Sequence, residues 1–61
     1  MAKIPPRLYA VVKLALIKGY FQHWIAARLG VNQGRISEFK NSPLFDLTTP
    51  ATSLPDGWET N

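Results

Sequence analysis

The sequence predicts an all-α fold, with three short helices in residues 6–41 and an extended, non-helical C-terminal tail over residues 42–61. Three observations favour it. Apolar residues recur at helical spacing, glycine separates the helical stretches, and the composition shifts toward proline and threonine after Ser42. A chain of 61 residues is expected to form one domain, here with residues 1–5 as an N-terminal arm.

The first predicted helix spans about residues 6–18. Its apolar positions follow the i, i+3, i+4, i+7, i+8 spacing of one helix face: Leu8, Val11, Val12, Ala15 and Leu16. Pro5 and Pro6 precede or open it, and proline is accepted in a first helical turn because its missing N–H would be unpaired there. Lys18 followed by Gly19 is a typical helix end.

The second predicted helix spans about residues 21–29. Phe21, Ile25 and Leu29 stand at i, i+4, i+8 and are expected to form its apolar face. Gly30 should end it, because glycine readily takes the left-handed conformation that closes a helix.

The third predicted helix spans about residues 33–41. Asn32 is a favoured N-cap residue, and Ile36 and Phe39 are expected to face inward. Asn41, followed by a proline at position 43, should stop the helix.

The tail from Ser42 is rich in proline and threonine, yet it carries several apolar side chains: Leu44, Phe45, Leu47, Leu54 and Trp58. These are too many for a plain linker. Two alternatives stay open, that the tail folds back over the helices or that it pairs with another chain, with Leu44, Phe45, Leu47 and Trp58 as a candidate dimer contact.

The charge is unevenly distributed. All seven Lys and Arg residues precede position 42 and Glu38 is the only acid there, so residues 1–41 carry 7 − 1 = +6. Asp46, Asp56 and Glu59 give the remainder 0 − 3 = −3. A basic segment of this kind is typical of proteins that bind polyanions, although a basic solvated surface would look the same.

Several classes of function are not expected. The chain has no cysteine, and its single histidine, His23, has no partners at metal-ligand or catalytic-triad spacing. We therefore predict no enzyme activity, no metal, no cofactor and no small-molecule ligand. The longest apolar stretch, residues 8–17, is too short to span a bilayer, and nothing resembles a targeting segment, so an intracellular, cytoplasmic protein is expected.

Residues 22–41 carry the most informative pattern. A small residue, Ala26, is followed after four positions by Gly30, then by Val31, and Ile36 comes six positions after Gly30. Two short helices that cross steeply need a small residue at the contact, a left-handed turn residue and a capped second helix. The stretch resembles the helix-turn-helix of phage repressors, resolvases and related bacterial regulators. The motif core would then be Ile25, Ala26, Leu29, Gly30, Val31 and Ile36.

This resemblance implies that the third helix enters the major groove of DNA and that its N-terminal residues face the base edges. Gln33 is the first candidate reader, Arg35 would read guanine or hold a phosphate, and Ser37 would contact a base or a phosphate. Asn32 is either a base contact or only the cap. Glu38 would accept from cytosine or pair with a neighbouring cation, and we favour the pairing.

The candidate phosphate contacts are Arg28, Lys40, Lys3, Arg7 and Lys18. Gly34, which costs helix stability, would permit close approach of the backbone to DNA. The function implied is a sequence-specific, repressor-like transcriptional regulator that binds double-stranded DNA as a homodimer. The alternative is a small protein-interaction module, adaptor-like or antitoxin-like, that uses the first helix and the aromatic tail and reads no bases.

Overall fold

The computed structural model describes residues 3–58. The first two residues of the predicted arm and the last three of the predicted tail, Glu59 among them, lie outside the described residues. The described part is helical, without a strand, and the all-α prediction is confirmed. In chain order the elements are a 3-10 turn η1 (Pro6–Leu8), α1 (Tyr9–Ile17), α2 (Gln22–Leu29), α3 (Gln33–Lys40) and α4 (Pro43–Leu47).

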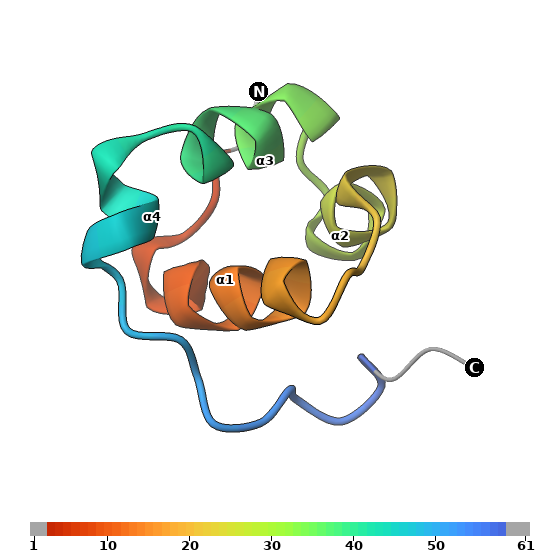
Figure 1. Cartoon of the computed structure of the whole chain (residues 1–61). Coiled ribbons are helices and arrows are strands. Elements are labelled where there is room, and N and C mark those ends of the chain that lie inside the picture. Colours follow the sequence, from red (N-terminus) through yellow and green to blue (C-terminus); the bar gives the residue numbers. More distant parts are fainter. Residues whose placement is uncertain (1–2, 59–61) are drawn as a thin grey trace.

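The helices surround one core. In Figure 1, α1 and α3 run across the picture below and above the core, α2 lies at one end and is seen nearly along its axis, and α4 closes the other end. The side chains buried in this core come from both termini and from α1, α2 and α3: Ile4, Val12, Ala15, Ile25, Ala26, Ile36, Phe39 and Trp58. Val12, Ile25 and Ile36, one from each of the three predicted helices, are fully buried.

Two glycines end α1 and α2 in the same way. Gly19 has φ 90° and Gly30 has φ 70°. After α1, the Gly19 N–H donates to Leu16 and the Tyr20 N–H to Ala15. This pair of bonds, closed by a left-handed glycine, is a Schellman cap. The predicted helix ends at both glycines are therefore confirmed.

The tail departs from the prediction at its start, because residues 43–47 form the short helix α4. Pro43 is predicted to help stop the third helix, and α3 does end before it, at Lys40. The non-helical prediction for the tail is wrong over residues 43–47, because Pro43 occupies the first turn of α4, where its fixed φ suits a helix and its missing N–H leaves no unpaired donor. Ser42, extended as a residue before proline should be, separates α3 from α4.

Beyond α4 the chain folds back over α1, where Figure 1 shows it running beneath that helix. The Ala51 N–H donates to the Ala10 carbonyl oxygen at 3.1 Å. Trp58 is only 6% exposed, and its ring meets the Trp24 ring edge-on at 5.8 Å between centroids. Trp58 is therefore part of this chain's own core, which favours the alternative in which the tail folds back over the helices.

Phe21 also departs from the prediction. It was expected on the apolar face of the second helix, but its side chain is 72% exposed. The helix begins one residue later, at Gln22, and Phe21 is its extended N-cap residue. Its side chain therefore leaves the inward stripe, and its ring stacks instead on His23, 5.5 Å away.

A lysine joins α1 to α4. Lys13, which stands off the apolar stripe of the first helix, donates a hydrogen bond from Nζ to the Phe45 carbonyl oxygen. The same Nζ lies 4.7 Å from the centroid of the Phe45 ring, within the range of a cation–π interaction. One partly buried cation of α1 thus contacts both the backbone and the side chain of Phe45 and links α1 to α4.

Replacing Trp58 by alanine should lower the free energy of unfolding by about 3 kcal/mol, since a buried ring would be lost from a small core. A chain of this length has only roughly 3–9 kcal/mol of stability in total. Urea unfolding followed by circular dichroism measures the change. Leu47→Ala, at a side chain 78% exposed, is the control and should change little. Equal stability of the two variants would show that the tail does not pack on the helices.

Replacing Lys13 by methionine should cost about 1 kcal/mol, because the Phe45 carbonyl loses a charged donor and the ring loses its cation. Lys18→Met removes the same charge from an exposed position of the same segment and should lie within about 0.5 kcal/mol of the parent chain. The two variants are compared by urea unfolding. A Lys13→Met chain as stable as Lys18→Met would contradict a structural role for this contact.

Candidate nucleic-acid interface

The α2–α3 unit has the left-handed glycine turn that the sequence predicts. The two helices are joined by a three-residue turn, Gly30–Asn32, which opens with the left-handed glycine. The Gly30 and Val31 N–H groups donate to the Ala27 and Ala26 carbonyls. The predicted motif residues lie as expected: Ile25, Ala26 and Ile36 are buried, Leu29 and Val31 pack against the core, and Gly30 is exposed in the turn.

Asn32 caps α3. Its backbone is extended, and its side-chain oxygen accepts a hydrogen bond from the Gly34 N–H at 2.7 Å. A Cβ atom at Gly34 would lie 3.1 Å from that same oxygen, which is tighter than ordinary contact. The Asn32 cap therefore explains locally why a glycine stands at position 34, without any approach of the backbone to DNA.

The core fixes which side of α3 faces outward. Ile36 and Phe39 point into the core, whereas Gln33, Gly34 and Glu38 are exposed. The remaining predicted readers, Arg35 and Ser37, are partly exposed. The outer surface of α3 therefore consists of polar side chains on a helix whose inner side is anchored.

The outer residues of α3 form two flanks. Gln33 and Ser37 are four residues apart and share one side of the helix. Arg35 and Glu38 are three residues apart and share the opposite side. Gly34 lies between them and presents no side chain. The structure thus separates Arg35 from the other two predicted readers.

Arg35 and Glu38 form an ion pair with 3.2 Å between Nη1 and Oε1. The favoured pairing of Glu38 with a neighbouring cation is confirmed. The arginine side chain is 33% exposed and the glutamate side chain 69%. Solvent screens such a pair, so it contributes at most about 1 kcal/mol to stability.

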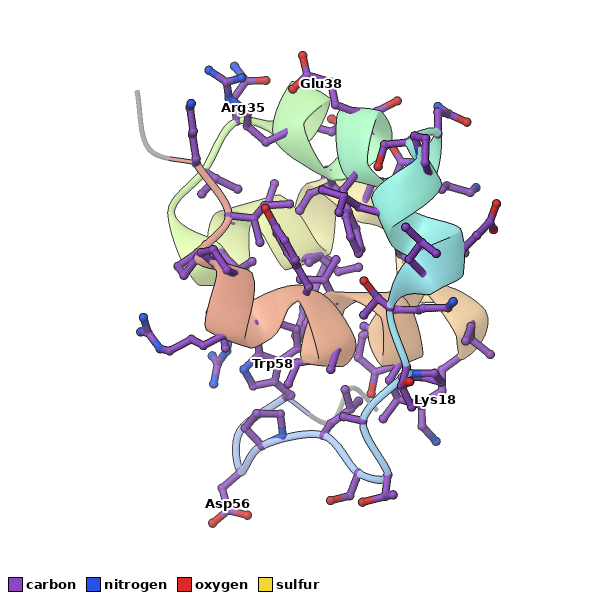
Figure 2. The ribbon with its side chains drawn as sticks, turned by 90° about the vertical axis from the view of Figure 1, so that its left-hand side faces the viewer. Lys18, Arg35, Glu38, Asp56 and Trp58 are labelled. Carbon is purple, nitrogen blue, oxygen red and sulfur yellow. The ribbon has the colours of Figure 1, made fainter. Side chains whose placement is uncertain are left out.

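The candidate phosphate contacts lie in different places. Lys3 is exposed and lies beside α3, where it and Arg35 line the same surface hollow. Arg7 and Lys40 are exposed on η1 and α3. Lys18, in contrast, lies across the molecule from Arg35 (Figure 2).

Arg28 lies against the tail of the chain. Its guanidinium lies directly against Gly57, where an added Cβ atom would collide with it. Gly57 has φ 84°, in the turn that carries the chain to Trp58. Although Arg28 is exposed, this contact makes it a neighbour of the tail.

The hollow beside α3 has a volume of about 260 Å³ and is bounded by the N-terminal segment, α1, α3 and α4. Its lining residues are Lys3, Ile4, Tyr9, Arg35, Glu38, Phe39, Ser42 and Leu44. The Tyr9 and Phe39 rings stack at 5.0 Å between centroids. Tyr9 was not singled out by its sequence surroundings, because its partner lies thirty residues further along the chain.

Other kinds of site find no support in residues 3–58. No group of three or more His, Cys, Asp or Glu side chains in this range could hold a metal ion. Within the same range, no helix is both long and apolar enough to cross a membrane. The surface of α3 and the adjoining hollow are therefore the strongest candidate site of the described chain.

No protein-family model, no curated protein and no solved structure matches this chain. A function for it has to be inferred from the burial, charge and geometry of the residues described above.

Proposed function

We propose that this protein binds double-stranded DNA in a sequence-specific manner, with α3 in the major groove. The observation that carries the proposal is the division of α3 into an anchored inner side and a polar outer side. Ile36 and Phe39 hold the helix in the core, and Gln33 and Ser37 stand on its outer surface. The major groove admits an α-helix, and a glutamine amide at its edge matches the donor and acceptor of adenine.

The charge distribution supports the same function. Residues 1–41 carry +6, and this basic segment includes α3 and its surroundings. Asp56, in the acidic part of the chain, lies on the far side of α1 from Arg35 and Glu38 (Figure 2). The part of the tail around Asp56 therefore lies away from the proposed DNA-binding surface, and Glu38 is the one acidic residue of α3 itself.

The proposal includes regulation of transcription, repressor-like, in the cytoplasm of a bacterial or phage-infected cell. A single small unit reads only a few base pairs, so two copies on a two-fold-related site are expected. Of the tail residues first considered for the dimer contact, Leu44 and Leu47 remain exposed.

A second candidate function is the protein-interaction module that reads no bases. Among residues 3–58, four large apolar side chains are exposed and would serve it: Ile17, Phe21, Leu44 and Leu47. Trp58, on which this alternative also relied, is buried. The interaction module would therefore have only part of the proposed aromatic and apolar binding surface exposed.

DNA binding is tested by selecting duplexes from a random library and measuring their affinity over a range of salt concentrations. About four phosphate contacts per chain would give a log–log slope near −3.6 for each bound chain, which is roughly a 100-fold loss of affinity per chain between 50 and 200 mM salt. No measurable affinity of the folded chain for any duplex at low salt would favour the interaction module instead.

Base reading is tested with Gln33→Ala on the selected duplex and on versions changed at single base pairs. We expect a loss of discrimination at one position of roughly 5- to 100-fold, the value of a bidentate amide–adenine contact. Thr52→Ala, at an exposed polar residue of the tail, should leave discrimination unchanged. An unchanged base preference in Gln33→Ala would remove Gln33 as a reader.

A further inference from the structure

Two basic residues from distant parts of the sequence line the hollow beside α3. Lys3 comes from the N-terminal segment and Arg35 from the first turn of α3, and both line the hollow together with Glu38. Tyr9 and Phe39, stacked on each other, lie in the same lining. The charged groups around the hollow thus comprise two cations and one carboxylate.

We propose that Lys3 and Arg35 jointly bind one phosphate group of the DNA backbone, and that Glu38 holds Arg35 until that phosphate replaces it. This inference rests on the proposed DNA binding and assigns Arg35 to the backbone instead of to guanine.

The surroundings of Arg35 favour a phosphate over a base. A helix in the major groove has a wall of phosphates along each side. Gln33 and Ser37 occupy one flank of α3, and Arg35 occupies the opposite flank, next to the N-terminal segment. Lys3 adds a second cation on this same flank, where a phosphate wall would lie.

The chemistry of the two cations suits a phosphodiester. Arginine presents five donors in a planar fork, and the ion pair with Glu38 engages Nη1. The other donors are suited to the paired oxygens of a phosphate, and Lys3 supplies a mobile point charge beside them. Because the Glu38 side chain is 69% exposed, water can solvate its carboxylate when a phosphate takes its place, and the exchange costs little.

Glu38 has a definite role in this arrangement. In the free protein it keeps the Arg35 guanidinium on its own flank of α3. On DNA its negative charge opposes the approaching phosphate, whatever the base sequence. Glu38 therefore weakens binding to all duplexes alike, which differs from the effect of a carboxylate that reads cytosine.

The shared phosphate is tested with Lys3→Ala, Arg35→Ala and the double variant, using the selected duplex across a range of salt concentrations. Each single change should weaken binding, and the double variant should lower the magnitude of the salt slope by about 0.9 for each bound chain, the value for one phosphate. Lys18→Ala, which removes a matched lysine from across the molecule, should leave the slope unchanged. The number of chains per duplex is measured alongside, and a double variant that lost about twice this slope for each bound chain would indicate two separate phosphates and overturn the joint site.

The role of Glu38 is tested with Glu38→Gln against Asp56→Asn, an isosteric change of equal charge on the far side of the molecule. Glu38→Gln should strengthen binding to selected and scrambled duplexes by up to about fivefold. Asp56→Asn should have a much smaller effect. Weaker binding of Glu38→Gln to the selected duplex alone would show that Glu38 reads a base, and would overturn the proposed exchange.

These outcomes separate the inference from the function on which it rests. If the parent chain binds DNA and Lys3→Ala binds identically at every salt concentration, the phosphate site is wrong and DNA binding stands. If the folded parent chain binds no duplex, both proposals fail. Since Lys3 and Glu38 are exposed, their variants should fold, and circular dichroism checks this.

Discussion

The rest of the structure depends on one buried cluster, to which α1, α2 and α3 each contribute a completely buried β-branched side chain. Val12, Ile25 and Ile36 are these residues. A chain of this length without cysteine has no disulfide to supplement its core, so burial of apolar surface has to supply most of its stability. Because each helix is fixed by its own buried residue, the outward side of each helix is fixed as well.

Burial of the inner side of α3 also determines which of its residues form the proposed DNA-binding surface. With Ile36 and Phe39 in the core, Gln33 and Arg35 have to stand on opposite flanks of the helix. The Asn32 cap fixes where α3 begins, and this sets the position of Gln33 along the helix axis. Recognition of a base requires such a rigidly placed side chain, because a misplaced amide loses its bidentate geometry.

The tail completes a core that three helices alone leave open. Trp58 covers Trp24, whose ring meets Tyr20 edge-on at 5.3 Å, and Phe45 meets Phe39 at the other end of the molecule. These two aromatic clusters lie on either side of the buried aliphatic residues. A segment that is polar and proline-rich in composition is thus a structural part of the domain.

The sequence by itself determined the features that depend on near neighbours. The helix ends at Gly19 and Gly30, the Asn32 cap and the Arg35–Glu38 pair all involve residues within five positions of each other. Their physical causes, a left-handed glycine, a short acceptor side chain and i, i+3 spacing, are visible in the local sequence.

Only the tertiary structure decided the features that depend on distant residues. The approach of Lys3 to Arg35 and the burial of Trp58 against Trp24 join segments more than thirty residues apart, and no local pattern specifies such pairs. The sequence did not predict α4 because a proline can either end one helix or begin another. The contact between Lys13 and Phe45, which lie 32 residues apart, favours the helix that begins at Pro43.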